Sequence, residues 1–353
     1  MRSVLLFLPL LMAGLLAPVS GRSKYGRKRD PEKENFSIVA YVPEYRFGGL
    51  NFDFVGERTT DLILFSAEPT KSGGLHFFFA PDDLKRAQAI RESHGVRLLL
   101  CVGGGGRSGN FAHVTSDPVL MDSFVSTLLE TLKKYNLQGI DFDWEQPVNQ
   151  QEASLYSKLI VVASTALRPK KYLVTAALHS WQTYLSADAV NSLDRVHLMS
   201  YDNQGKHSTF ASAKKDVKSI LKSGFPPYKV ALGFPGYGRS LSSPGNVQTY
   251  EEIVNNFSPK PADDIAGPDS FYFNGVETVK KKTTYALKRG LAGLMLWEAG
   301  QDTKDPSTSL LGAVKDALVA SGEKFVQRKE ETKRSAPKGR RRRRRIAIDA
   351  DEL

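Results

Sequence analysis

The chain has 353 residues, of which 41% are hydrophobic and 25% are charged, and its formal net charge is +11. This composition is that of a globular protein with a large core, and it excludes a fibrous or wholly disordered chain. Most of the excess positive charge lies near the two ends, so the nearly neutral middle gives no electrostatic argument for binding nucleic acid.

Residues 1–21 have the layout of a signal peptide. Arg2 precedes an apolar run, Val4–Leu16, and small residues follow it. The run is short for a bilayer span, although an anchoring helix is the alternative. We therefore expect a secreted protein with no membrane span after cleavage. A basic linker, residues 22–35, ends at Asn35, which begins an Asn-Phe-Ser sequence and is predicted to be N-glycosylated.

The middle of the chain alternates between two kinds of segment. Short apolar runs bounded by turn residues predict eight strands: Phe36–Val42, Asp61–Phe65, Val96–Val102, Gly139–Glu145, Tyr172–Ala177, Arg195–Tyr201, Lys229–Phe234 and Leu291–Trp297. Helical periodicity fills most of the gaps, at Pro81–His94, Val119–Tyr135, Ala153–Leu167, Ala211–Gly224 and Thr278–Gly290. This alternation indicates right-handed βαβ units with parallel strands. Eight repeats within residues 36–322 favour an α/β fold, a closed (β/α)8 TIM barrel, with a short insertion between strands seven and eight.

One predicted strand carries three acids. Side chains alternate between the two faces of a strand, so Asp141, Asp143 and Glu145 share one face and apolar residues occupy the other. If the apolar face packs on helices, the acids point into the barrel, where aliphatic side chains are usual. Neighbouring carboxylates raise one another's pKa, so the group retains a proton, and a proton on Glu145 would serve a general acid. The alternatives are a solvated edge strand and a calcium site.

The segment from Gln138 to Glu145 resembles the signature of glycoside hydrolase family 18, the chitinase family. The family pattern is Asp-x-x-Asp-x-Asp-x-Glu, and Gln138 stands where the first Asp is expected. Four more segments agree with the family in order along the chain: Leu98–Gly104, with Cys101 where Ser is usual, Met199–Asp202, Gly233–Arg239 and Gly293–Trp297. The similarity covers roughly residues 37–320.

The resemblance implies a retaining hydrolase of β-1,4-linked N-acetylglucosamine polymers such as chitin or chitooligosaccharides. In this family the acetamido oxygen of the sugar attacks the anomeric carbon, so no second carboxylate needs to do so. Glu145 would protonate the leaving oxygen and then activate water. Asp143 would orient the acetamido N–H, and Asp141 would share its proton. The resemblance implies no metal ion and no organic cofactor.

Sugar contacts are expected at the carboxyl ends of the strands. By resemblance, Tyr201 bonds the acetamido carbonyl, Asp202 contacts the distorted sugar or the acid, and Trp297 forms an apolar floor. The remaining candidates for substrate contacts are Met199, Tyr41, Tyr237 and Trp181. Each aromatic residue has a plainer interpretation as part of the core or the surface.

Two other functions fit the same residues. A chitinase-like lectin would keep the fold and bind sugar without turnover, but such relatives typically lack the acid at the position of Glu145. An endo-β-N-acetylglucosaminidase acting on N-glycans would use the same acids. Because the segment between strands seven and eight is too short for the insertion domain of many processive chitinases, we expect an open cleft.

Residues 323–353 are predicted to form a basic, disordered tail. Within it, Arg340–Arg345 could contact anionic glycans or surfaces, and the plainer alternative is a solvated tail. The chain ends in Ala-Asp-Glu-Leu, which resembles the luminal retention signal without its first Lys, so the lumen of the endoplasmic reticulum is the alternative to secretion. Cys101 is the only cysteine, which excludes an intramolecular disulfide.

Overall fold

The computed structural model describes residues 35–325. The predicted signal peptide (1–21), nearly all of the basic linker (22–35) and nearly all of the tail (323–353), including Arg340–Arg345, lie outside the described residues. Among the residues that are described, no helix has both the length and the apolar character needed to cross a membrane.

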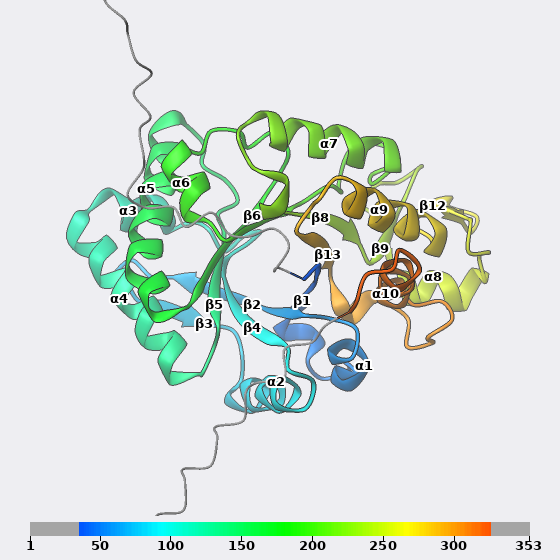
Figure 1. Cartoon of the computed structure of the whole chain (residues 1–353), viewed down its shortest axis with the longest axis horizontal. Coiled ribbons are helices and arrows are strands. Elements are labelled where there is room, and N and C mark those ends of the chain that lie inside the picture. The colour runs from blue at the N-terminus through cyan, green and yellow to red at the C-terminus, as the bar shows by residue number, and fades with distance from the viewer. Residues whose placement is uncertain (1–34, 326–353) are drawn as a thin grey trace, which may run out of the picture. The chain divides into compact units, whose positions relative to one another are not determined.

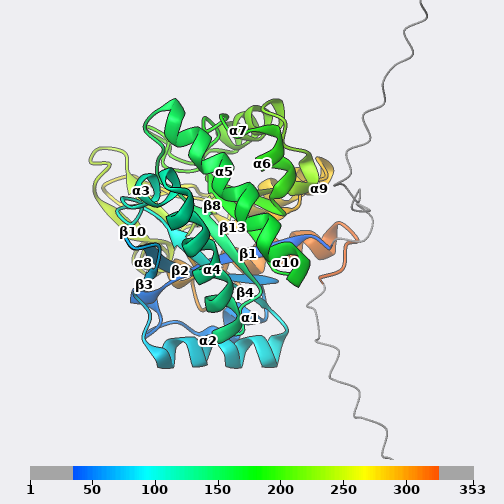
Figure 2. The ribbon, with the colours of Figure 1, turned by 90° about the vertical axis from the view of Figure 1, so that its left-hand side faces the viewer.

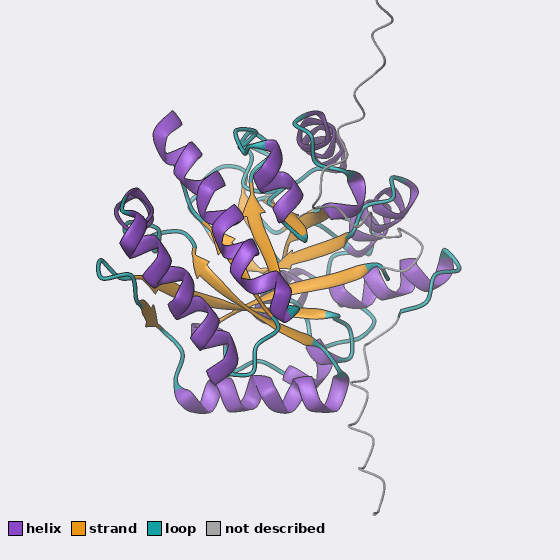
Figure 3. Ribbon diagram, turned by 60° about the vertical axis from the view of Figure 1, so that its left-hand side comes forward, coloured by secondary structure: helices purple, strands orange, loops and turns teal. Residues whose placement is uncertain are grey.

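Eight parallel strands form a closed barrel, which confirms the predicted (β/α)8 fold. The barrel strands are β1 (Ser37–Pro43), β2 (Asp61–Pro69), β4 (Arg97–Gly103), β5 (Gly139–Asp143), β6 (Leu173–Leu178), β7 (Arg195–Leu198), β8 (Val230–Pro235) and β13 (Gly293–Trp297). The barrel closes because β1 pairs on one side with β13, Ser37 opposite Gly293, and on the other with β2, Val39 opposite Asp61. Figure 3 shows the strands at the centre and the helices around them.

The helices cover the outside of the barrel (Figures 1 and 2). The barrel helices are α1 (Phe52–Gly56), α2 (Pro81–His94), α3 (Phe111–Ser116), α4 (Pro118–Lys134), α5 (Gln150–Leu167), α6 (Ala187–Ser192), α7 (Phe210–Lys222), α9 (Val276–Lys288) and α10 (Leu310–Ala320). Short 3-10 turns occur at Glu44–Arg46, Arg168–Lys170, Pro227–Lys229 and Ala299–Gln301, and a small strand, β3 (Leu75–Phe77), pairs with β2.

Local sequence explains where helices begin and end. Helix α2 starts with Pro81, whose fixed φ suits a first turn, and stops at Gly95, which takes a left-handed φ of 67°. Its buried residues, Leu84, Ala87 and Ile90, follow helical spacing and face the barrel.

The insertion between β8 and β13 is a small antiparallel sheet with one helix. Its elements are β9 (Tyr237–Ser240), β10 (Val247–Thr249), α8 (Tyr250–Phe257), β11 (Ile265–Ala266) and β12 (Phe271–Tyr272). The strands are ordered β10-β9-β12-β11, and in Figure 1 they lie with α8 beside the barrel, near α9 and α10. The predicted short insertion is therefore present.

Two strands are shorter than predicted at the end that carries the site. Strand β5 stops at Asp143 instead of Glu145, and its last bond to β4 is the one from the Gly104 amide to the Asp143 carbonyl at 2.6 Å. Strand β7 stops at Leu198, since the chain turns there and reaches a positive φ of 59° at Asp202. Glu145 and Asp202 therefore lie on the loops that follow these strands.

Candidate active site

The alternation along β5 separates apolar from acidic side chains as predicted. Ile140, Phe142 and Trp144 are buried in the apolar layer between strands and helices. Asp141 and Asp143, both almost completely buried, point instead toward residues of the barrel interior. That interior otherwise holds apolar and aromatic side chains: Val39, Tyr41, Ile63, Phe65, Leu99, Cys101, Ala177, Met199, Tyr201, Ala231 and Met295.

Asp141 accepts hydrogen bonds from side chains of three other barrel strands, β1, β6 and β7. The Tyr41 hydroxyl donates to its Oδ2 atom at 2.5 Å, and the Thr175 hydroxyl donates to its Oδ1 atom at the same distance. His197 Nδ1 lies 3.0 Å from Oδ1. Burial and the charge on Asp141 raise the pKa of Tyr41 well above its ordinary value, so Tyr41 stays protonated and keeps its role as a donor.

The carboxyl groups of Asp143 and Glu145 are hydrogen-bonded to each other, so one of them holds a proton. Burial raises the pKa of Asp143 well above its usual range, and the charges of Glu145 and Asp141 raise it further. Burial also raises the pKa of Glu145, but its hydrogen bonds with Asp143 and the Gly105 backbone oppose the rise. Burial is the largest cause of the raised pKa in both groups, so the pair holds a proton, as expected from the spacing of the acids.

One oxygen of Asp143 is left without a partner. Its Oδ1 atom is buried and makes no hydrogen bond within the described residues. An unpaired buried acceptor is unfavourable by about 1–3 kcal/mol. The site therefore offers a ready acceptor for an N–H group of a ligand.

A glycine-rich loop after β4 wraps around the acids. Gly104 has a φ of 102°, and a side chain there would collide with the ring of Phe65. The loop is fastened by Ser108, whose hydroxyl accepts a hydrogen bond from the Glu145 amide at 2.9 Å. Glycine is thus required where backbone, aromatic ring and acid come together.

Trp297, half-buried, ends β13 among other aromatic rings. Its ring centroid lies 5.4 Å from that of Tyr41 and 4.8 Å from that of Phe65. Tyr41 in turn donates to Asp141, so one aromatic ring connects the indole to this acid.

Tyr201 and Met199 lie just past β7 and are buried in the interior cluster. Within residues 35–325, the hydrogen-bond partner found for the Tyr201 hydroxyl is the Met295 sulfur, at 4.0 Å. Sulfur is a weak acceptor, so this hydroxyl remains available to a stronger one. Burial raises its pKa well above the ordinary value, which keeps the proton on Tyr201.

The insertion holds Asp202 in place. Its Oδ1 atom accepts a hydrogen bond from the Tyr237 hydroxyl at 2.6 Å and one from Arg239 Nε at 2.7 Å. Partial burial raises the pKa of Asp202, but these two donors lower it more, so the pKa lies below its usual value. The Asp202 charge in turn raises the pKa of Glu145, so the two carboxyl groups are electrostatically linked.

Trp181 lies after β6 and is 57% exposed. Its indole stacks on the His179 ring, with centroids 5.3 Å apart and an angle of 11° between the planes. Burial lowers the pKa of His179, whereas a hydrogen bond with the Met199 backbone and the charge of Asp202 raise it. His179 and Trp181 therefore lie on the same face of the barrel as the acids. The predicted catalytic and sugar-contacting side chains therefore lie in the barrel interior or beyond the carboxyl ends of its strands, whereas Asn35 lies before the start of β1.

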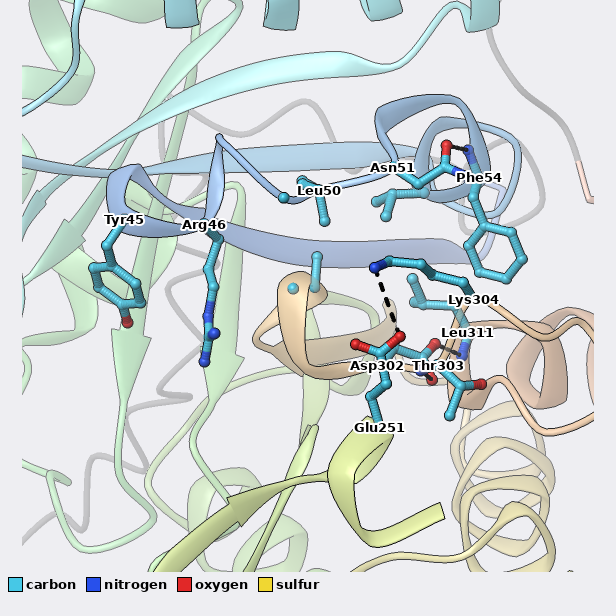
Figure 4. A pocket seen from close by; sticks show the side chains of 14 residues that line it. Tyr45, Arg46, Leu50, Asn51, Phe54, Glu251, Asp302, Thr303, Lys304 and Leu311 are labelled. Atoms are coloured by element: carbon cyan, nitrogen blue, oxygen red, sulfur yellow. Dashed lines mark hydrogen bonds and ion pairs between the residues drawn. The ribbon is translucent and has the colours of Figure 1, made fainter. Parts of the chain in front are cut away.

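A pocket of about 230 Å³ adjoins this face, between the turn after β1 and the segment after β13. Figure 4 shows Lys304 and Glu251 facing each other there, 3.7 Å apart, with Arg46 nearby. Arg46 Nε donates to Glu298, the buried residue that follows Trp297, at 2.8 Å. The Arg46–Glu298 ion pair therefore connects the pocket to the segment that carries Trp297.

Several residues of the site were not identified from the sequence: Ser108, Thr175, His179, His197 and Arg239. Two of them carried a signal. His197 is a polar residue on the inward face of a barrel strand, and Arg239 closes a segment that was already noted. No group of three or more His, Cys, Asp or Glu residues within 35–325 is arranged to hold a metal ion.

The profile of the family "Glycosyl hydrolases family 18" matches residues 31–302. A class V chitinase of Arabidopsis thaliana is 25% identical over 289 residues, which cover 65% of this chain and 76% of that protein. The GH18 chitinase ChiB from the chitin utilization locus of Flavobacterium johnsoniae is 26% identical, with a TM-score of 0.73 over 82% of this chain and 96% of that one. The chitinase-like agglutinin RobpsCRA of Robinia pseudoacacia shares the fold, with 22% identity and a TM-score of 0.69 over 79% of this chain and 98% of that one.

Proposed function

The chain belongs to family 18 of the glycosyl hydrolases, and we propose that it hydrolyses β-1,4-linked N-acetylglucosamine polymers by a retaining, substrate-assisted mechanism with Glu145 as general acid and base. As a glycoside hydrolase it needs an acid close to the bond that it cleaves. The observation that carries the mechanism is the unpaired Oδ1 atom of Asp143 beside the proton-sharing pair. An acetamido N–H is the group that would satisfy this acceptor.

The first step uses the proton of the pair. Substrate binding brings the acetamido N–H to Asp143, and the proton passes along the hydrogen bond to Glu145. Glu145 donates it to the glycosidic oxygen as the bond from that oxygen to the anomeric carbon breaks. The acetamido carbonyl oxygen forms a new bond to the anomeric carbon, and anionic Asp143 stabilises the positive oxazolinium.

The second step restores the acid. Glu145, now a carboxylate, takes a proton from water while the water oxygen bonds to the anomeric carbon. The bond between that carbon and the acetamido oxygen breaks, and the product keeps the β configuration. Glu145 ends the cycle protonated and can share its proton with Asp143 again.

The other side chains bind and orient the sugar. The available Tyr201 hydroxyl suits the acetamido carbonyl, and the Trp297 indole suits the apolar face of the ring. Asp202, Tyr41, Met199 and Tyr237 complete the walls. The exposed Trp181 indole offers a flat surface on the leaving-group side.

We assign residues 36–322 to the hydrolase domain, which is supported by the positions of β1 and α10 as its first and last elements. The signal peptide and secretion remain part of the proposal, as does retention in the endoplasmic reticulum as the alternative. Asn35 is exposed, which supports its use as a glycan acceptor. An anionic surface remains the proposed partner of Arg340–Arg345.

The test is a product profile from the hexamer of N-acetylglucosamine, with the anomer of the first product read by NMR. We expect shorter oligomers with β-anomeric ends from the wild type and none from Glu145→Gln, with Glu130→Gln as an exposed control. Binding of the hexamer without turnover would establish the lectin alternative. Preferential cleavage of a high-mannose glycopeptide would establish the endo-β-N-acetylglucosaminidase.

A further inference from the structure

A chain of buried polar groups runs through the barrel beneath the acids. It connects Asp61 on β2, Arg195 and His197 on β7, and Asp141 on β5. Arg195 Nη1 lies 3.4 Å from Asp61 Oδ2, and Arg195 Nε donates to His197 Nε2 at 2.9 Å. His197 Nδ1 reaches Asp141 Oδ1 at 3.0 Å. None of the four side chains is more than 7% exposed, so these contacts are made without competition from bulk water.

Arg195 decides which nitrogen of His197 carries the proton. A guanidinium can only donate, so the His197 Nε2 atom must accept with its lone pair. In a neutral imidazole the proton then resides on Nδ1, the nitrogen that faces Asp141. Arg195 itself is held by Asp61, which Arg97 also pairs with, and by the Ser37 hydroxyl at 2.9 Å. The Asp61 end of this series of contacts therefore fixes the direction of its hydrogen bonds.

We propose that His197 is a positioning residue for the reaction: its Nδ1–H holds the Asp141 carboxylate and stabilises its negative charge while Asp143 and Glu145 exchange the catalytic proton. This inference rests on the proposed hydrolase function. His197 touches no substrate atom and acts through Asp141. Without the Nδ1 donor, the Asp141 carboxylate keeps only its bonds from Tyr41 and Thr175, and the acid cluster loses one donor to its negative charge.

The groups that face His197 leave its ring neutral on balance. They are Tyr41 of β1, Asp61 of β2, Asp141 of β5 and Arg195 of β7 itself. Burial lowers the pKa of His197 most, Asp141 and Asp61 raise it, and Arg195 lowers it again, so that the pKa falls below the ordinary value. A second ring proton would also break the bond from Arg195. His197 therefore works as a fixed donor and not as a proton carrier.

Two substitutions separate the two hydrogen bonds of the ring. The amide nitrogen of His197→Asn can take the place of Nδ1 and donate to Asp141, but it leaves Arg195 without its acceptor. The amide oxygen of His197→Gln can take the place of Nε2 and accept from Arg195, but the donor to Asp141 is lost. We expect kcat on the N-acetylglucosamine hexamer to stay within about threefold of wild type for His197→Asn. For His197→Gln we expect a fall of about 10²-fold with little change in KM.

The pH profile distinguishes positioning from a purely structural role. Loss of the donor lets the acid cluster bind a second proton more readily, so the acidic limb of kcat/KM moves to higher pH in His197→Gln and stays in place in His197→Asn. Equal losses in both variants with unmoved limbs would overturn the inference. An inactive wild type would instead refute the proposed function, so the two failures are distinguishable.

Selective ¹⁵N labelling of histidine in the wild-type protein gives a readout that needs neither activity nor a variant that folds. We expect one ring, protonated at Nδ1 and unprotonated at Nε2, that does not titrate between pH 5 and 8. Either variant that folds identifies the His197 signals by their loss. A protein whose six histidines all show the opposite tautomer or become doubly protonated in this range would contradict the inference.

Discussion

Ser108 accepts a hydrogen bond from the backbone amide of Glu145 at 2.9 Å and lies 3.1 Å from the carbonyl oxygens of both Gly104 and Asp143. A single buried hydroxyl thus joins the glycine-rich loop to the end of the acidic strand. This contact holds the backbone of Glu145, the proposed general acid, because Glu145 lies beyond the last ladder bond of β5.

Ser108→Ala should misplace the acid. The substitution leaves the Glu145 amide without its acceptor, which destabilises the fold by about 1–3 kcal/mol. Since small displacements of a reacting group can lower rates by up to about 10²-fold, we expect kcat to fall at least tenfold. Thermal denaturation and steady-state kinetics measure the two effects. Ser116→Ala, at an exposed hydroxyl on α3, is the control and should change neither.

In the proposed mechanism, the proton shared by Asp143 and Glu145 sets the alkaline limit of activity. Both groups have a raised pKa, so the pair keeps its proton above the ordinary carboxyl range and loses it as the pH rises through the raised values. We expect the alkaline limb of kcat above about pH 4.3, the usual value for glutamate. An alkaline limb at that ordinary value would contradict the assignment.

Asp143→Asn tests the same pair by removing the acid and the anion together. The amide keeps the shape but can neither give its proton to Glu145 nor stabilise a cation, so kcat should fall by about 10²–10⁴-fold. Asp188→Asn, an exposed acid on α6, should retain full activity. A fall in Tm comparable to that of a core substitution would show that the loss comes from unfolding instead.

The contacts of Asp202 predict an effect on binding. Arg239→Met removes a donor at 2.7 Å, so the pKa of Asp202 rises and its hold on the sugar weakens. Calorimetric titration of Glu145→Gln with the hexamer should show tight binding that weakens about tenfold when Arg239→Met is added, as expected for about 1.4 kcal/mol. Unchanged affinity would exclude a role for this side chain in binding.

The two tryptophans at the site should respond differently to truncation. Trp297 packs against Tyr41 and Phe65, so Trp297→Ala should lower both kcat/KM and stability, the latter by less than the roughly 3–5 kcal/mol typical of a fully buried aromatic residue. Trp181 is 57% exposed, so Trp181→Ala should raise KM and leave Tm unchanged. Equal effects on Tm would contradict this difference.

A buried lysine gives the stability a distinct pH dependence. Lys282 on α9 donates to the Ser208 hydroxyl and to Asn274 Oδ1, at 2.8 and 2.7 Å, and burial lowers its pKa to about 7. The unfolded lysine keeps its proton to about pH 10.4, so between the two values the unfolded state binds one more proton and stability rises with pH. Denaturant unfolding at several pH values should show this slope in the wild type and its loss in Lys282→Met. Parallel curves for the two proteins would contradict it.

The barrel was predictable from the sequence because each strand is a short apolar run bounded by turn residues, which is the pattern of a strand buried on both faces. All eight predicted strands overlap an observed one, and Pro81–His94 matches α2 at both ends. The short helices α1, α3 and α6 were missed because five or six residues hold too little periodicity to be recognised. Helix α10 is long enough, but it was also missed. Most of its residues are apolar, so its buried face cannot be distinguished from its exposed face by sequence periodicity.

The strand period identified Asp141 and Asp143, and it also pointed to Glu145. The family resemblance added Asp202. What the sequence did not predict is that Glu145 and Asp202 lie on loops, whose course depends on Gly104 and on a positive φ at Asp202. Contacts between distant strands, such as Arg195 with Asp61, have no local signature. They exist only because closure of the barrel brings β2 and β7 to the same interior.

The pairing of β1 with β13 places the first barrel strand beside the last, with Ser37 opposite Gly293. A side chain at Gly293 would collide with the Ser37 carbonyl, so only glycine fits at this position of the seam. During synthesis on the ribosome, β1 must therefore wait for nearly the whole described chain to emerge before its outer edge is covered. Until then it is an open edge to which other chains could add, and the nascent protein is most exposed to misassociation just before its last strand arrives.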